Sequence, residues 1–129
     1  MYGFDVTIKA TMEEAETKVR DALMEVGFGI LTEIDVQKVM KAKLDVDRAG
    51  YKILGACNPN FAHKAIEAEP DIGLLLPCNV LLQELENGEV KVGFMDPNAV
   101  LKLVDNPLVH EVAPQVRDIL KKVADSLAV

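Results

Sequence analysis

The spacing of the hydrophobic residues changes along the chain, and these changes limit the folds open to it more than any other feature. Residues 2–8 and 28–35 alternate apolar and polar side chains, which is the two-residue period of a half-buried strand. Residues 11–26 and 107–127 instead repeat their apolar side chains at helical spacing. The chain must therefore bury both strands and amphipathic helices.

Capping and turn signals predict the remaining elements. Thr11 and Glu14 have the spacing of a capping box, which places a helix start at residue 11. Asn58 before Pro59 predicts a second helix, which must end before Pro70. The other predicted elements are a short helix after Asp35, a strand at 51–57, a long apolar stretch at 72–85, and a short turn or helix at 98–104. Pro114 predicts a kink or restart in the last helix.

Asn87-Gly88 is a strong signal for a hairpin with a two-residue turn. That turn would pair Leu85 with Val90, and Glu84 with Lys91. Continuing this register, Gln83 would pair with Val92, and Leu81 with Phe94. The opposite charges of Glu84 and Lys91 agree with this register.

The resulting order, β-α-β-α-β-α-β-β-α, lacks the strict alternation of a doubly wound parallel sheet. It predicts a single α+β domain, residues 1–129, with one mainly antiparallel sheet and long helices packed on one face. The helices at 11–26 and 107–127 each carry one apolar stripe, so both should cover the same face. Lys52, Glu84 and Lys91 then belong on the other face or at an edge.

The hairpin strands carry apolar side chains on both faces. Leu81, Leu85, Val90 and Phe94 are expected on one face, and Val80, Leu82 and Met95 on the other. Two helices do not easily cover both faces, so one apolar patch is left for a second copy of the chain. We therefore predict a homodimer.

The charge balance argues against two classes of partner. The chain has 14 basic and 21 acidic residues and a net charge of −7, without a basic run. Nucleic acid and anionic membrane surfaces both require clustered Lys and Arg, so neither partner is predicted. No apolar run approaches the length of a membrane span, and the first residues lack a signal peptide. We expect a soluble, cytoplasmic protein with both cysteines reduced.

Two similar segments carry the candidate site: Cys57-Asn58-Pro59 and Pro77-Cys78-Asn79. Each sets a cysteine beside an asparagine and near a proline, where a strand ends or bends. Cys57 would precede a helix N-terminus, which favours thiolate. Two interpretations stay open: the cysteines form a shared or single reactive thiol site, or both are small buried hydrophobic residues.

His63 is the best third member of a metal site with Cys57 and Cys78. Two thiolates and an imidazole would suit a soft metal such as zinc or copper(I). Their spacing is much less specific than a paired C-x-x-C motif, and a solvated histidine is the alternative. The sequence contains no phosphate-binding or dinucleotide motif, so the cofactor stays unknown.

The same segments carry a resemblance to an uncharacterised family, domain of unknown function 302. The similar stretches are Tyr51–Pro59, Ala62–Ala65, Glu69-Pro70 and Gly73–Val80, with Val26–Val36 and Met95–Pro97. The resemblance implies a TBP-like fold, which is a curved antiparallel sheet with helices packed on it. It implies no activity and no catalytic residue.

Three functions from different classes remain. The first is a non-enzymatic module that binds a small ligand or soft metal at the two cysteine turns. The second is a structural homodimer. The third is a thiol redox enzyme that uses Cys57, with Cys78 as the resolving thiol. Lys52 and Lys64 are the cations nearest to Cys57 in sequence, and neither is certain to face its thiol, which weakens the enzyme hypothesis.

Overall fold

Five antiparallel strands form one sheet in the order β1-β5-β4-β3-β2. They are β1 Gly3–Ile8, β2 Gly29–Asp35, β3 Tyr51–Cys57, β4 Cys78–Glu84 and β5 Val90–Met95. The computed structural model describes residues 1–128, so the last residue of the predicted domain, Val129, lies outside the described residues. The predicted α+β class and antiparallel sheet are confirmed, and the arrangement is compatible with a TBP-like fold.

The helices begin where the capping signals predict. They are α1 Met12–Glu25, α2 Val36–Leu44, α3 Pro59–Ala68, α4 Pro97–Val100 and α5 Pro107–Leu127, with the short 3-10 helices η1 Pro70–Leu75 and η2 Leu101–Leu103. Both hydrogen bonds of the Thr11–Glu14 capping box are present. A kink or a restart was predicted at Pro114; helix α5 continues through this residue without a restart. Between residues 1 and 128, none of the helices combines the length and apolar character needed to cross a bilayer.

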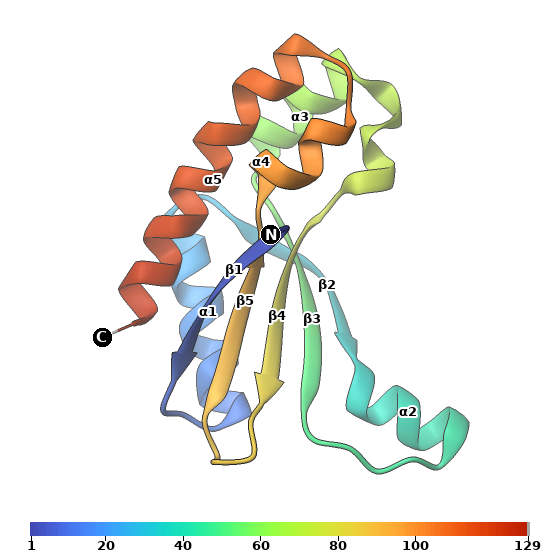
Figure 1. The fold of residues 1–129 in the computed structure, drawn as a ribbon, viewed down its shortest axis with the longest axis vertical. Helices are drawn as coiled ribbons and strands as arrows, with labels where there is room; N and C mark the ends of the chain where they lie inside the picture. The colour runs from blue at the N-terminus through green and yellow to red at the C-terminus, as the bar shows by residue number, and fades with distance from the viewer. Residues whose placement is uncertain (129) are drawn as a thin grey trace.

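The main core lies between one face of the sheet and the helices α1 and α5. Val80 and Leu82 of β4 pair with Phe94 and Val92 of β5, and all four side chains are buried. The helices add Ala15, Val19, Leu23, Val116, Leu120 and Val123 to the same cluster. Figure 1 shows α1 behind the strands and α5 along the β1 edge. The prediction that both helices cover one face is confirmed.

The hairpin register differs by one residue from the prediction. Glu84 pairs with Val90, and Gln83 pairs with Lys91. A two-residue type I′ turn needs positive φ at both central residues, but only Gly88 has one, with φ 81°. Gly88 instead ends a three-residue loop between Leu85 and Glu89, whose backbones hydrogen bond at 2.8 Å. The predicted division of the hairpin side chains was therefore wrong: Val80 and Leu82 share the buried face with Val90 and Phe94.

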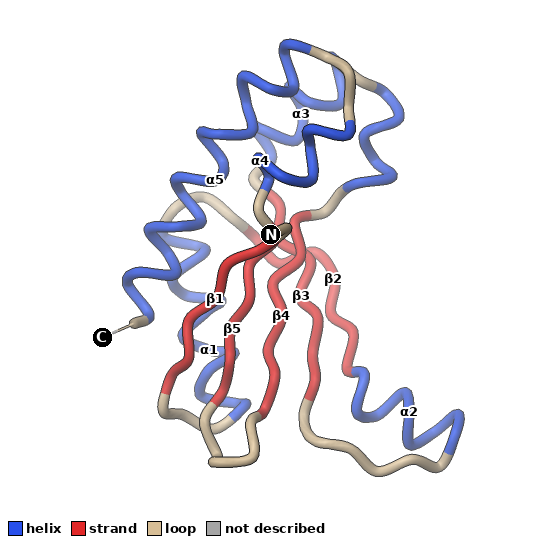
Figure 2. Tube along the Cα trace, viewed as in Figure 1, coloured by secondary structure: helices blue, strands red, loops and turns tan. Residues whose placement is uncertain are grey.

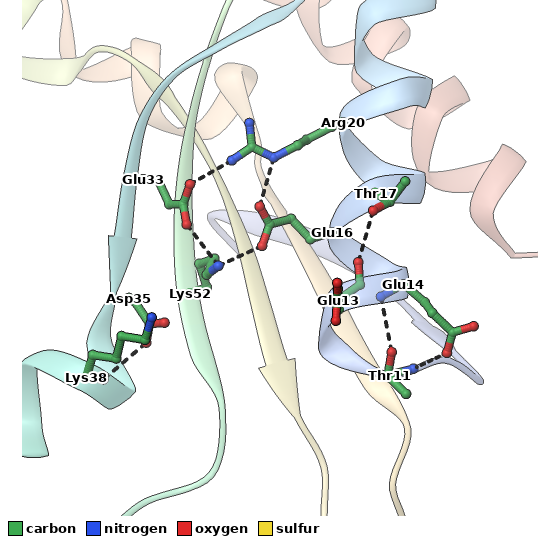
Figure 3. Close-up of polar contacts among 10 residues, drawn as sticks. All are labelled: Thr11, Glu13, Glu14, Glu16, Thr17, Arg20, Glu33, Asp35, Lys38 and Lys52. Atoms are coloured by element: carbon green, nitrogen blue, oxygen red, sulfur yellow. Dashed lines mark hydrogen bonds and ion pairs between the residues drawn. The ribbon is translucent and has the colours of Figure 1, made fainter.

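Lys52 lies on the helix-covered face, contrary to the prediction. Its Nζ is 2.7 Å from Glu16 of α1 and 2.9 Å from Glu33 of β2, and Arg20 contacts both carboxylates (Figure 3). Burial alone would raise the pKa of Glu16, but the hydrogen bonds from Lys52 and Arg20 outweigh it and lower that pKa. The carboxylates of Glu16 and Glu33 therefore balance the charge of Lys52 on the helix-covered face, where α1 crosses the sheet.

A second, smaller core lies at one end of the sheet. It contains Ala65 of α3, Ile72 of η1 and Leu101 of η2, together with Val109 and Ala113 of α5. In Figures 1 and 2, α3, α4 and the first half of α5 gather at the end where β3 finishes and β4 begins. The long helix α5 therefore contributes to both cores.

Candidate functional site

A cavity of about 310 Å³ lies at the boundary between the two cores. Its walls include Phe28, Ala56 and Val116 from the main core and Ala65 and Ile72 from the smaller one. The remaining lining residues are Leu31, Cys57, Asn58, Phe61, Ala62, Ile66, Gly73, Leu76, Pro77, Cys78, Pro97, Leu101 and Val112. None of these lining residues is charged. The cavity is thus an apolar space between helices and the ends of two central strands.

Both cysteines line this cavity and neither forms a disulfide. Cys57 is half-buried at the end of β3, and Cys78 is buried at the start of β4. Ala56 pairs with Cys78 across the two strands, which places Cys57 one residue beyond that pair. Burial raises the pKa of the Cys78 thiol to about 11, and the nearby Cys57 thiol adds to the rise. Cys78 is therefore protonated at neutral pH.

Asn58 and Pro59 start α3 beside the cavity. The Asn58 Oδ1 accepts hydrogen bonds from the backbone N–H groups of Asn60, at 3.1 Å, and Phe61, at 3.4 Å. The predicted cap is thus present, and Asn58 is also one of the residues that line the cavity. Pro59 occupies the first turn but lies outside the lining. Its effect on the site is to set where α3 begins.

Pro77 packs onto the backbone of β3. A Cβ at position 55 would lie 2.6 Å from the Pro77 Cγ and would overlap the Thr32 Oγ1. Only glycine at position 55 lets the Pro77 ring and the Thr32 side chain sit this close to the strand. Gly55 therefore fixes how the chain enters β4 and where Pro77 meets the cavity.

His63 and Asn79 lie outside the cavity. His63 is exposed on α3 and is absent from the lining, and Asn79 borders a different hollow over β1, β5 and β4. Within residues 1–128, no group of three or more His, Cys, Asp or Glu side chains is arranged to hold a metal ion. The structure thus brings together Cys57, Asn58, Pro77 and Cys78, but not the predicted trio of Cys57, Cys78 and His63.

Most residues of the cavity wall carry no distinguishing sequence signal, because they resemble ordinary core residues. Two of them sit at the exposed rim: Leu31, 66% exposed, and Ile66, 44% exposed. Leu31 falls at an irregularity where the pairing of β2 with β3 skips from Ile30 to Thr32. A β-bulge changes the direction in which a side chain points. No local sequence pattern predicts the irregularity at Leu31.

The chain matches, over residues 4–127, the model of the family described as domain of unknown function DUF302. It belongs to this family. A crystal structure of an uncharacterized conserved DUF302 protein from Bacillus stearothermophilus matches with a TM-score of 0.90 and 26% sequence identity, covering 98% of each chain. The resemblance inferred from the two cysteine segments is therefore confirmed.

A short stretch also matches an uncharacterized protein of Aquifex aeolicus (strain VF5). The two are 38% identical over 45 residues, which span 34% of this chain and 31% of that protein. Neither this relative nor the DUF302 description names an activity.

Proposed function

We propose that this DUF302 protein binds a small apolar molecule in the cavity between its two cores, without catalysing a reaction on it. The supporting observation is the cavity itself, with its volume of about 310 Å³ and apolar walls. Small-molecule sites are typically concave, mostly apolar and of roughly 300–1,000 Å³. Wall atoms that face empty space lose dispersion contacts, and a bound apolar molecule restores them.

The lining favours a neutral ligand over a charged one. No lining residue carries a charge, and burying an unpaired charge costs several kcal/mol. The lining residues with polar side chains are Asn58, Cys57 and Cys78. Because the Asn58 Oδ1 already caps α3, its amide NH₂ is the group left to donate a hydrogen bond.

A neutral fluorescent probe tests this proposal. We expect N-phenyl-1-naphthylamine to bind the wild-type protein with increased fluorescence and to bind Ala62→Leu at least about tenfold more weakly, because leucine fills the cavity. Ala68→Leu is the matched control: Ala68 is also half-buried on α3 but does not line the cavity.

Circular dichroism and thermal unfolding establish that both variants fold. Equal probe binding by wild type and Ala62→Leu, with Ala62→Leu folded, would contradict the proposal. Loss of binding in Ala68→Leu alone would place the probe elsewhere and contradict it too.

A second proposal, a homodimer, is supported by the sheet face opposite α1 and α5. Ile34, 47% exposed, pairs with Ile53, which in turn pairs with Leu81 across β2, β3 and β4. None of these three side chains belongs to either core cluster. An apolar stripe of this kind is suited to contact with a second copy of the chain. The molecular mass measured by light scattering distinguishes a dimer from a single chain.

A further inference from the structure

We propose that the free edge of β1 binds an extended peptide segment of a partner protein as a sixth, antiparallel strand of the sheet. A basic residue of this peptide would lie opposite Asp5, and an apolar side chain would enter the hollow that Gly93 helps to line. The site is separate from the apolar cavity. It depends neither on the proposed binding of a small molecule nor on a homodimer.

The backbone of β1 offers a regular row of hydrogen-bonding groups. β1 is the last strand at its side of the sheet and pairs with β5 over six consecutive residues without a register shift. Beside this ladder, the backbone N–H of Asp96 donates to the Tyr2 carbonyl oxygen at 2.9 Å. Hydrogen-bonded pairs alternate along an antiparallel ladder, so the even-numbered residues of β1 also bond to β5. The N–H and C=O groups that point away from the sheet belong to Gly3, Asp5 and Thr7.

The opposite edge of the sheet, β2, is less suited to an added strand. The pairing of β2 with β3 shifts between Ile30 and Thr32, and such an irregularity hinders the addition of a further strand. Proline and lysine residues also protect edge strands, but the six residues of β1 include neither. β1 is therefore the edge that is open to a partner.

Helix α5 flanks the β1 edge but does not occupy the plane of the sheet. Its buried side chains belong to the main core on the covered face, and Figure 1 shows the helix beside β1. Arg117 and Lys121 of α5 lie over the Phe4 ring, each 5.6 Å from the ring centre. Asp5 and Thr7 stay exposed. An added strand would therefore meet β1 in the sheet plane, with α5 on one side of it.

A hollow on the open face gives room for one side chain of the peptide. It has a volume of about 370 Å³ and spans β1, β5 and β4. Its lining includes Gly93, which pairs with Asp5 on one side and with Leu81 on the other. Gly3 lies between the hollow and the edge, and a Cβ there would be 2.8 Å from the Phe94 carbonyl oxygen. A peptide side chain opposite Gly3 can therefore reach across this glycine into the hollow.

Charge favours a basic peptide over a second copy of β1. Asp5 lies in the middle of the edge with its side chain 43% exposed, and the Lys91 Nζ is 3.8 Å from its carboxylate. Two copies of β1, paired through all three outward-facing residues, would place Asp5 opposite Asp5, and like charges in directly opposed positions are destabilising. A lysine or arginine opposite Asp5 forms a favourable pair instead. The net charge of −7 also attracts a basic segment.

The test uses the synthetic peptide acetyl-Thr-Val-Lys-Val-Phe-amide, whose lysine comes opposite Asp5 and whose phenylalanine comes opposite Gly3. Two further peptides carry leucine or methionine in place of the phenylalanine. In amide NMR spectra of the full-length protein at low ionic strength, we expect saturable binding. The largest shifts should occur at the N–H groups of Gly3, Asp5 and Thr7, because these groups gain hydrogen bonds.

N-methylated peptides distinguish strand addition from other kinds of binding. Methylation of the lysine nitrogen removes an N–H that faces β1, and it should weaken binding at least about tenfold. The matched control is methylation of the fourth residue, a valine whose N–H faces away from β1, and it should have little effect. Both peptides leave the protein unchanged, so this comparison does not depend on the folding of a variant.

Protein variants test the two side-chain contacts. Asp5→Asn should abolish the preference for lysine over glutamate at the third peptide position, whereas Asp21→Asn, at an exposed carboxylate on α1, should retain it. Gly93→Val should weaken binding of the phenylalanine peptide about fivefold, because valine fills part of the hollow. An added Cβ at position 93 meets only the Leu81 Cβ, at 3.8 Å, so this variant should fold.

The proposal is overturned if none of the three peptides binds, or if the largest shifts lie outside β1 and the hollow. It is also overturned if the peptide methylated at lysine binds as tightly as the unmodified one. Unchanged charge preference in Asp5→Asn, or unchanged binding of the phenylalanine peptide by folded Gly93→Val, equally contradicts it.

Discussion

At the scale of single residues, Gly55 shows how one missing side chain shapes the site. Thr32 from β2 and Pro77 from the entry to β4 both pack against its Cα. A side chain at this position would push the Pro77 ring, which lines the cavity, away from the sheet. The close approach of these segments therefore depends on glycine for steric reasons, since Gly55 has no positive φ.

Gly55→Ala should lower the free energy of unfolding by about 1–3 kcal/mol, because the added methyl group overlaps Thr32 and Pro77. The matched control is Gly93→Ala in β5, where the new methyl group would meet only the Leu81 Cβ, at 3.8 Å. Gly93→Ala should leave stability unchanged or raise it slightly. Urea unfolding measures both changes, and equal effects at the two positions would refute this account of Gly55.

At the scale of elements, local signals set where helices begin, while loop geometry sets the strand register. Thr11, Asp35, Asn58, Asp96 and Asn106 each cap a helix through a side-chain oxygen. The hairpin is different, because Asn-Gly is compatible with a two-residue and a three-residue loop. One extra loop residue moves the pairing by one position, and it changes which side chains face each other.

Gly88→Ala tests the loop geometry. Because Gly88 has φ 81°, a conformation that costs an L residue about 1–2 kcal/mol, we expect destabilisation of that size. Gly29→Ala is the control, since Gly29 has no positive φ and no atom within 4 Å of an added Cβ. Thermal unfolding compares the two variants. An unchanged Tm in Gly88→Ala would argue against the left-handed conformation.

At the scale of the whole molecule, the helices cover one sheet face and one sheet end, and the other face stays open. Helices α1 and α5 pack on the covered face, and α3, η1 and η2 form the smaller core with the first half of α5. The cavity arises where the two cores meet, because neither one fills the space beside the ends of β3 and β4. The open face carries the apolar stripe of Ile34, Ile53 and Leu81.

If a second copy covers this stripe, light scattering at tens of micromolar should give twice the 14.1 kDa chain mass. Leu81→Glu should restore the single-chain mass, because it places a charge within the apolar face. Leu108→Glu is the control, since Leu108 is 59% exposed on α5, away from this face. A single-chain mass for wild type would contradict the dimer.

The candidate site was only partly predictable. Cys57, Asn58, Pro77 and Cys78 stood out because each lies where a strand meets a turn, and all four line the cavity. The apolar wall gave no signal, since a leucine or alanine beside a cavity has the same local sequence pattern as one in a filled core. His63 was grouped with the thiols by its nearness in sequence, but it projects from the exposed side of α3.

The order and type of the elements follow from local sequence, because periodicity and capping act between residues a few positions apart. The sequence also marked the two cysteine turns and the membership in the DUF302 family. Tertiary packing sets the hairpin register, the helix-side position of Lys52, and the cavity lined by the two cysteines. Each of these depends on how segments distant in the chain pack together, and local patterns do not encode that packing.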